Sequence, residues 1–140
     1  MKKLILGAIT AALMSTAAHA ENIGVSMALF DDNFLTVLRN GMNEYAKTQD
    51  DVTLQIEDAQ NDVAKQLDQI NNFVASGVDA IIVNPVDTSA TEAMTKAAEA
   101  AGVPLVYVNR EPINVDTLPD NQAFVASNEQ ESGTLETKEV

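Results

Sequence analysis

Ala80-Ile81-Ile82-Val83 is an uninterrupted apolar run that stops at the polar pair Asn84-Pro85. The run Leu105-Val106-Tyr107-Val108 follows the same pattern and stops at Asn109-Arg110. A short run that is apolar at every position, rather than at alternate positions, is typical of a central strand covered on both faces of a parallel sheet. The two runs therefore predict two central strands with a polar pair at the carboxyl end of each.

Two further apolar runs also end in polar clusters. Residues 23–27 lead into Phe30-Asp31-Asp32-Asn33-Phe34, and residues 124–126 lead into Ser127-Asn128. If the four runs are parallel neighbours, the four polar clusters lie at one edge of one sheet. Open α/β folds bind small ligands at this edge. The sequence therefore predicts a binding site together with a fold.

Helical patterns separate the predicted strands. The first helix carries apolar residues at helical spacing on one face, namely Phe34, Leu35, Leu38, Met42 and Tyr45. The second helix begins near Asn61-Asp62, which are good caps, and ends at Gly77. Its apolar stripe consists of Val63, Leu67, Ile70, Phe73 and Val74.

A third helix and an edge strand complete the pattern. Ser89 and Glu92 have the spacing of a capping box, and an alanine-rich helix follows through Ala101 to Gly102. Pro104 prevents the helix from continuing. Residues 52–56 alternate between apolar and polar side chains, which is typical of an edge strand.

The predicted elements follow the order β-α-β-α-β-α-β-β-α, with a loop over residues 111–122 and a last helix from about Asn128 that Val140 cuts. This alternation favours right-handed crossovers and a parallel sheet. We expect an α/β three-layer sandwich with strand order 2-1-3-4-5 and a ligand at the switch point between strands one and three. Because the last helix lacks a closing glycine, we expect the chain to be a piece of a longer protein.

The first twenty residues have the pattern of an export signal. Lys2 and Lys3 form a basic start, an apolar stretch follows, and Ala18-His19-Ala20 fits a signal peptidase site. The apolar stretch is too short to span a membrane. We expect residues 1–20 to be a cleaved signal peptide and the mature chain to begin at Glu21; the alternative is a buried N-terminal helix.

The composition excludes several functions. The net charge is −13, or −15 without the two lysines of the leader, and such a surface repels nucleic acid and anionic lipid. The chain has no cysteine, and its one histidine, His19, lies in the leader. It lacks a phosphate-binding loop and a nucleophile elbow, and its acidic pairs lack the spacing of a calcium loop. We expect no enzyme, no cofactor and no metal.

The first polar cluster contains two candidate ligand contacts. The Asp32 carboxylate can accept two hydroxyl hydrogen bonds, and the Phe34 ring, together with Phe30, can cover the C–H face of a sugar or cyclic polyol. The alternative is structural: Asp32 caps the first helix and Phe34 belongs to the core. The two roles are compatible for Asp32, and Phe34 can likewise pack partly inward while its edge lines the cleft.

The other clusters offer amide, guanidinium and hydroxyl groups. Asn84 provides a donor and an acceptor for a hydroxyl ligand, unless it only forms an Asx turn. The guanidinium of Arg110, directly after Asn109, suits vicinal hydroxyls or a carboxylate, and the alternative is a surface salt bridge with Glu111. Ser127 is a weak candidate by itself.

The chain resembles the N-terminal part of periplasmic sugar-binding proteins of ABC importers, of the ribose-binding type. The resemblance lies in four stretches: Val25-Ser26-Met27-Ala28 with residues 30–36, Ile82-Val83-Asn84-Pro85-Val86-Asp87, Val106-Tyr107-Val108-Asn109-Arg110, and Ala126-Ser127-Asn128-Glu129. The inositol- and rhizopine-binding members are the most similar. The resemblance implies ligand contacts at Asp32, Phe34, Leu35, Asn84, Asn109, Arg110 and Ser127.

Three positions depart from the ribose binders and favour a cyclic polyol over ribose. Leu35 replaces a second aromatic residue, Asp32-Asn33 replaces an asparagine and a proline, and Asn109 replaces an aspartate. The resemblance also implies that residues 21–140 are one lobe of a two-lobed, monomeric clamshell whose closed form an ABC permease recognises in the periplasm. The alternative is a sensor that presents the same lobe to a chemoreceptor or kinase.

Overall fold

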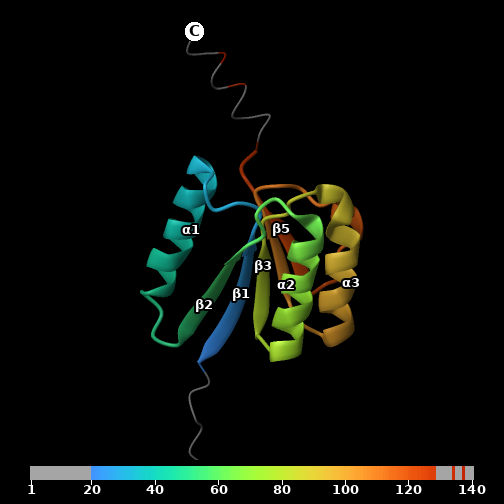
Figure 1. The fold of residues 1–140 in the computed structure, drawn as a ribbon, viewed down its shortest axis with the longest axis horizontal. Helices are drawn as coiled ribbons and strands as arrows, with labels where there is room; N and C mark the ends of the chain where they lie inside the picture. The colour runs from blue at the N-terminus through green and yellow to red at the C-terminus, as the bar shows by residue number, and fades with distance from the viewer. Residues whose placement is uncertain (1–19, 129–133, 135–136, 138–140) are drawn as a thin grey trace, which may run out of the picture.

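Five parallel strands form one sheet in the part of the chain that the structure describes (Figure 1). The structure is a computed structural model, and it describes residues 20–128, 134 and 137. The strand order is β2-β1-β3-β4-β5, which confirms the order expected from the sequence. In chain order the elements are β1 (Glu21–Met27), α1 (Asn33–Ala46), β2 (Val52–Asp58), α2 (Val63–Ser76), β3 (Ala80–Val83), α3 (Thr91–Ala101), β4 (Leu105–Val108) and β5 (Gln122–Val125).

The element order agrees with the sequence pattern as far as the description extends. Strand β2 runs two residues beyond the predicted end, and β5 begins two residues before the predicted start. The predicted loop over residues 111–122 contains a short 3₁₀ helix, Val115–Thr117. Residues 1–19 of the predicted leader, and the predicted last helix beyond residue 128 apart from residues 134 and 137, lie outside the described residues.

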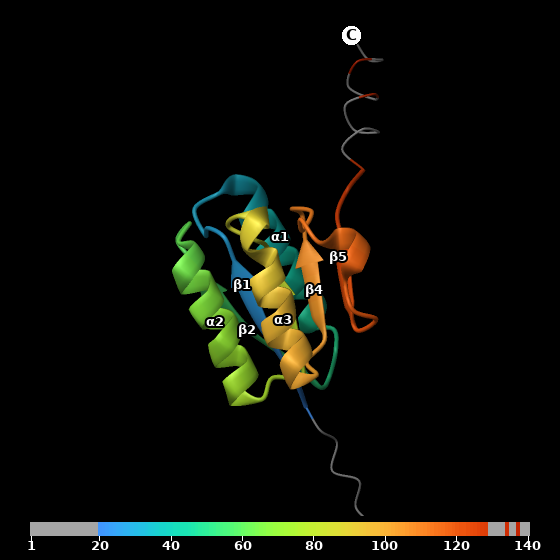
Figure 2. The same ribbon diagram turned by 90° about the vertical axis from the view of Figure 1, so that its right-hand side faces the viewer.

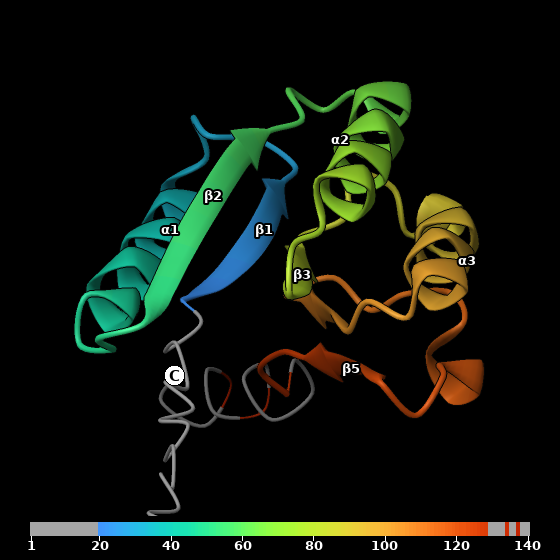
Figure 3. The same ribbon diagram turned by 90° about the horizontal axis from the view of Figure 1, so that it is seen from below.

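The helices cover opposite faces of the sheet and make three layers. Helix α1 lies on one face beside β2 and β1, and α2 and α3 lie side by side on the other face (Figures 2 and 3). The strand residues alternate accordingly. In β1, Val25 and Met27 belong to the core on the α1 side, whereas Gly24 and Ser26 face α2.

The larger core lies between the sheet and the α2–α3 layer. Its buried members are Ile70, Phe73, Val78, Ile81, Val83, Met94, Ala98, Leu105 and Tyr107. The hydroxyl of Tyr107 donates a hydrogen bond to the Thr91 carbonyl at 2.8 Å and lies 2.9 Å from the Thr95 hydroxyl. Burial of this phenol raises the pKa of Tyr107 to about 12. The Tyr107 hydroxyl is therefore hydrogen-bonded although it lies within an apolar core.

Gly24 allows α2 to approach β1 closely. A Cβ atom at this position would lie 2.5 Å from Cγ of the Phe73 ring, which is itself buried. Real carbon atoms do not approach so closely, so any side chain at position 24 displaces the ring or the helix. The absence of a side chain here sets the spacing between α2 and the sheet.

The helix caps follow the sequence with one exception. Asp32 and Asp62 cap α1 and α2 by accepting hydrogen bonds from main-chain N–H groups, and Gly77 and Gly102 end α2 and α3 with φ of 74° and 69°. The predicted capping box at Ser89 is wrong, because α3 begins later, after Ala90, which makes no side-chain cap.

Asp87 replaces Ser89 as the cap in this segment. It precedes a short 3₁₀ helix, Thr88–Ala90, and its carboxylate accepts a hydrogen bond from the Ser89 N–H at 2.8 Å. The hydrogen bonds from Ser89 lower the pKa of Asp87. The aspartate lies two residues before Ser89 and is the stronger acceptor, so it starts the helical turn earlier than the capping-box pattern predicts.

Helix α1 is confirmed, but its apolar face is narrower than expected. Leu35 is buried, and Leu38 and Met42 pack against the smaller core. Phe34 and Tyr45 are instead 57% and 69% exposed, so neither belongs to the core. Both residues lie at one flank of the apolar stripe, and each leaves more than half of its surface exposed.

Candidate ligand-binding site

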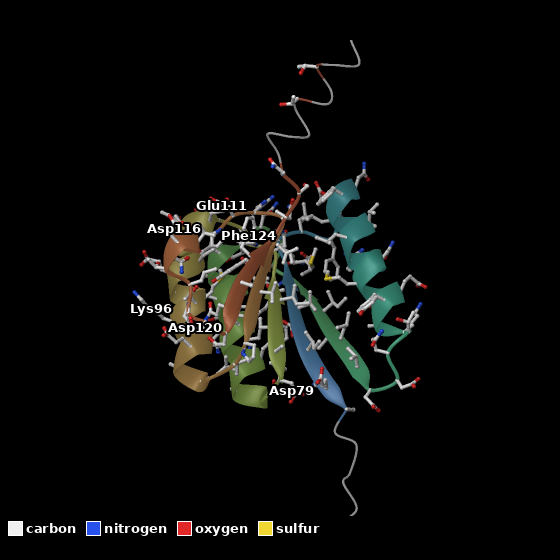
Figure 4. All side chains as sticks on the ribbon, turned by 180° about the vertical axis from the view of Figure 1, so that it is seen from behind. Asp79, Lys96, Glu111, Asp116, Asp120 and Phe124 are labelled. Carbon is white, nitrogen blue, oxygen red and sulfur yellow. The ribbon has the colours of Figure 1, made fainter. Side chains whose placement is uncertain are left out.

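The carboxyl ends of β1, β3, β4 and β5 meet at one edge of the sheet, because all neighbouring strands pair in parallel. This edge is the upper one in Figure 1. Figure 4 marks the two ends of the body: Glu111, the neighbour of Arg110, lies at the carboxyl edge, and Asp79 lies at the opposite end. The four polar clusters singled out in the sequence therefore gather on one side.

The residues at the start of α1 have two different environments. Asp32 is exposed and caps α1 through Oδ1, which accepts from the Leu35 N–H at 2.8 Å. Phe34 is mostly exposed, whereas Leu35 is only 3% exposed and belongs to the core. Leu35 therefore anchors the start of α1 in the smaller core, whereas Asp32 and Phe34 are exposed to solvent.

A shallow hollow lies between the start of α1 and the ends of β4 and β5. It has a volume of about 360 Å³. Its lining residues are Phe34, Leu38, Val108, Asn109, Val125, Ala126 and Ser127. Three of the predicted ligand contacts are thus brought together around an apolar surface: Phe34 on α1, Asn109 just after β4 and Ser127 just after β5. Asp32, Asn84 and Arg110 do not line the hollow.

Asn84 is fully buried at the end of β3. Its Oδ1 accepts from the Ala28 N–H at 3.4 Å, and its Nδ2 donates to the Val108 carbonyl at 3.3 Å. The side chain therefore ties the end of β3 to the ends of both neighbouring strands, through bonds at the long limit of hydrogen-bond geometry. Because the side chain has no exposed surface, direct contact with a ligand requires the amide or the residues that cover it to move.

Arg110 extends from the end of β4 to the loop after β3. Its Nη1 donates to the carbonyls of Pro85 and Val86 at 2.8 and 3.0 Å. Within the described residues, the guanidinium bonds to these carbonyls and not to the carboxylate of Glu111, so the surface salt bridge is not formed. The side chain is half-buried, and a guanidinium carries five N–H donors, so donors remain for a ligand.

The chain makes a tight turn at Asn109, immediately before Arg110. The Arg110 N–H donates to the Val108 carbonyl at 2.8 Å, which closes a three-residue turn with Asn109 at its centre. The φ of Asn109 is 68°, which is the rare and strained form of this turn. The Asn109 N–H donates to the Val125 carbonyl at 3.0 Å, so the strained residue is held by the neighbouring strand.

Phe30 has a partner that the sequence reading missed. The guanidinium carbon of Arg39 lies 4.0 Å from the centre of the Phe30 ring, a cation–π arrangement, and its Nη1 donates to the Phe30 carbonyl at 3.4 Å. Arg39 lies nine residues further along the chain, and only the helical turn of α1 brings it back. One face of the ring is therefore covered by a cation.

The sequence reading also missed two buried glutamines on α2. Gln66 and Gln69 are buried at the carboxyl edge and hydrogen-bond to strand and loop atoms. Their signal was present, because they lie four residues before Ile70 and Phe73 on the same helical face. A polar residue inside an apolar stripe indicates a buried hydrogen-bond network.

Two further features are absent from the part of the chain that the structure describes. Across residues 20–128, 134 and 137, no cluster of three histidine, cysteine or acidic side chains has the arrangement of a metal site. In the same ranges, every helix falls short of the length and apolar character that a bilayer-spanning segment needs.

Comparisons with known proteins agree with this geometry. A family model described as a periplasmic binding protein domain matches residues 23–140. A Rhizobium meliloti protein named "Putative rhizopine-binding protein" is 70% identical over 140 residues, which are 100% of this chain and 45% of that protein. The ribose import binding protein RbsB of Bacillus subtilis is 35% identical over 98 residues, which are 69% of this chain and 32% of that protein.

A solved structure has the same fold. The ABC transporter solute binding protein from Bacillus halodurans C-125, solved with bound myo-inositol, has a TM-score of 0.73 and 34% identity, and the match covers 87% of this chain and 44% of that one. The chain thus spans less than half the length of these relatives. Because the family model extends over most of the residues and the fold agrees, the chain belongs to the periplasmic binding protein domain family.

Proposed function

We propose that this chain is the N-terminal lobe, residues 21–140 behind a leader of residues 1–20, of a solute-binding protein for an ABC importer. It captures a sugar or a cyclic polyol of the inositol or rhizopine kind in the periplasm and performs no catalysis. The observation that carries the proposal is the half-buried guanidinium of Arg110, anchored through one nitrogen at the carboxyl edge beside an apolar hollow. The relatives named for rhizopine and ribose, and the neighbour solved with myo-inositol, support the choice of ligand class.

Each candidate residue has a role that fits its environment. The remaining donors of Arg110 and the amide of Asn109 bind ring hydroxyls, and the exposed carboxylate of Asp32 accepts from another. Phe34 covers the C–H face, with Phe30 beside it. The other predicted contacts act from the edge of the site or from beneath it: Leu35 by packing, Asn84 by holding the strand ends, and Ser127 from the far side of the hollow.

A single lobe contacts one side of its ligand. Polar contacts that remain open to water contribute little, since water competes for the same donors and acceptors. In a two-lobed protein a second lobe closes over the ligand, and the closed form is what a permease recognises. We therefore expect millimolar affinity or less for this chain alone, and submicromolar binding by the isolated chain would contradict the one-sided site.

The test uses a hybrid in which residues 21–140 replace the matching segment of the R. meliloti relative. The melting temperature is measured with myo-inositol, its amino derivatives, ribose and other pentoses. A ligand at 100 times its Kd stabilises the folded state by about 2.7 kcal/mol. We expect a cyclic polyol to raise the melting temperature and Arg110→Ala to abolish the rise.

The control for Arg110→Ala is Lys96→Ala. Lys96 is exposed on α3 and pairs only loosely with Glu92, at 3.7 Å. This variant removes one positive charge, as Arg110→Ala does, but away from the carboxyl edge. If Arg110→Ala retains the full ligand-induced rise, Arg110 is not part of the site; if no sugar or polyol raises the melting temperature, the proposed function is wrong.

A further inference from the structure

The loop that receives Arg110 is held from its other side by Gln66 on α2. Gln66 is fully buried. Its Oε1 accepts from the Val86 N–H at 2.7 Å, and its Nε2 donates to the Asn84 carbonyl at 3.0 Å. One side-chain amide therefore binds both ends of the three-residue segment Asn84-Pro85-Val86.

Every main-chain polar group of this segment has a partner. The Asn84 N–H donates to the Ser26 carbonyl at 2.9 Å, and Gln66 satisfies the Asn84 carbonyl and the Val86 N–H. Arg110 satisfies the carbonyls of Pro85 and Val86. Pro85 has no N–H, so the account is complete. The amide of Gln66 and the guanidinium of Arg110 thus divide the segment between them.

The orientation of the Gln66 amide is fixed by its neighbours. Ser26 Oγ donates its one proton to Gln69 Oε1 at 2.7 Å, so it can only accept from Gln66 Nε2, at 3.1 Å. Gln69 Nε2 in turn donates to the Asp58 carbonyl at 3.0 Å. With its NH₂ group directed to Ser26 and Asn84, Gln66 must present its oxygen to Val86.

We infer that Gln66 is a positioning residue for the ligand site. Its bond to the Val86 N–H fixes the peptide plane that also carries the Pro85 carbonyl, and this carbonyl, together with that of Val86, fixes the plane of the Arg110 guanidinium before any ligand arrives. A donor set held in place beforehand loses less conformational entropy on binding. The orientation of the guanidinium is a property of the chain itself; its consequence for ligand capture rests on the proposed function.

The role requires a donor and an acceptor on one side chain of this length. Methionine at position 66 keeps the length and the packing but removes both hydrogen bonds to the segment. Methionine at position 69 is the matched control: it removes a second buried glutamine and its bond with Ser26, but it leaves the Asn84 carbonyl and the Val86 N–H, which by themselves fix the direction of the Gln66 amide. Loss of stability alone affects both variants alike.

The readout is the nitrogen-15 NMR spectrum of the arginine side chains in the whole chain. The sequence has two arginines, so Arg39 is an internal reference for Arg110. Two hydrogen bonds from Nη1 slow rotation about the Nε–Cζ bond, and at low temperature the two Nη nitrogens of Arg110 give separate signals. We expect these signals to merge in Gln66→Met and to stay separate in Gln69→Met, with Arg39 unchanged in both.

The outcomes are decisive in either direction. Separate Arg110 signals in Gln66→Met, merged signals in both variants, or merged signals in the unmodified chain overturn the inference. If Gln66→Met does not fold, Gln66→Leu replaces it, since leucine likewise offers neither the acceptor for Val86 nor the donor for Asn84, and the same merging is expected. The measurement needs no ligand, so a failure to respond to myo-inositol counts against the proposed function and not against this role of Gln66.

Discussion

Asp32 combines a helix cap with an exposed position at the carboxyl edge. Its Oδ1 caps α1 at the Leu35 N–H, while the residue remains exposed at the carboxyl edge. The two alternatives drawn from the sequence are therefore compatible at this residue, as expected. Phe34 differs, because its mostly exposed ring rules out the core alternative and leaves the ring at the hollow.

The cap of α1 can be separated from the charge of Asp32. Asp32→Asn keeps an acceptor oxygen for the Leu35 N–H, so we expect a change in the free energy of unfolding within about 0.5 kcal/mol. Asp32→Ala removes the acceptor, and we expect a loss of about 1 kcal/mol. Urea unfolding of both variants measures the difference, and equal losses would show that the cap is not what Asp32 contributes to stability.

At the residue scale the sequence predicted positions better than environments. The polar residues after β3 and β4 lie at the expected edge, since strand direction alone places them there. The burial of Asn84 and the partners of Arg110 depend on how three strand ends share their carbonyls. No local pattern contains that information, because the partners come from segments far apart in the chain.

At the element scale, local signals predicted most helix boundaries. Asp62 and Gly77 set the ends of α2 through short-range hydrogen bonds and a left-handed residue, which are properties of neighbouring residues only. The predicted start of α3 was wrong because two acceptors, Asp87 and Ser89, compete within one turn. The predicted burial of Phe34 and Tyr45 was wrong for another reason: the width of a buried stripe depends on how many strands the helix covers.

The close approach of β1 and α2 gives a prediction for Gly24→Ala. The new methyl group would meet the Phe73 ring, and displacement of a buried ring costs about 1–3 kcal/mol. We expect the free energy of unfolding to fall by that amount in urea titrations.

Gly41→Ala is the matched control for this substitution. Gly41 lies within α1, and an added Cβ would meet nothing within 4 Å. Alanine favours a helix over glycine by up to about 1 kcal/mol, so this variant should be more stable than the unmodified chain. Destabilisation by both substitutions would mean that the contact with Phe73 is not the cause.

At the scale of the whole molecule, Tyr107 makes the free energy of unfolding depend on pH in the alkaline range. An unfolded tyrosine loses its proton near pH 10, whereas the buried phenol has a pKa of about 12. Below pH 10 both states keep the proton and stability is unaffected. Between pH 10 and 12 only the unfolded state ionises, so the free energy of unfolding should fall as the pH rises through this range.

Tyr107→Phe isolates this contribution. The variant loses the hydrogen bonds to Thr91 and Thr95, which lowers stability by an offset that does not vary with pH. The difference between the unmodified chain and the variant, measured by urea unfolding from pH 8 to pH 11.5, should be constant up to pH 10 and shrink above it. A difference that stays constant over the whole range would contradict the burial of an un-ionised phenol.

The sequence predicted the architecture of the whole molecule because strand and helix patterns alternate clearly, and alternation in a single chain allows few topologies. It predicted for the same reason the edge at which the four polar clusters gather. It could not predict which of the polar residues at that edge reach solvent, because this depends on side-chain packing between α1, β4 and β5. The hollow beside Phe34 and the network around Gln66 are therefore findings of the three-dimensional arrangement.

In the proposed site, the backbone at Asn109 restricts which side chains can stand at that position. A residue there must adopt φ of 68°, a conformation that glycine, asparagine and aspartate tolerate and that β-branched residues resist. Evolution at a ligand contact ordinarily samples many side chains, but at this position the conformation filters them first. Only a few residue types are thus available at position 109 for adaptation to a new solute, and larger changes in ligand preference must arise at other positions of the lobe.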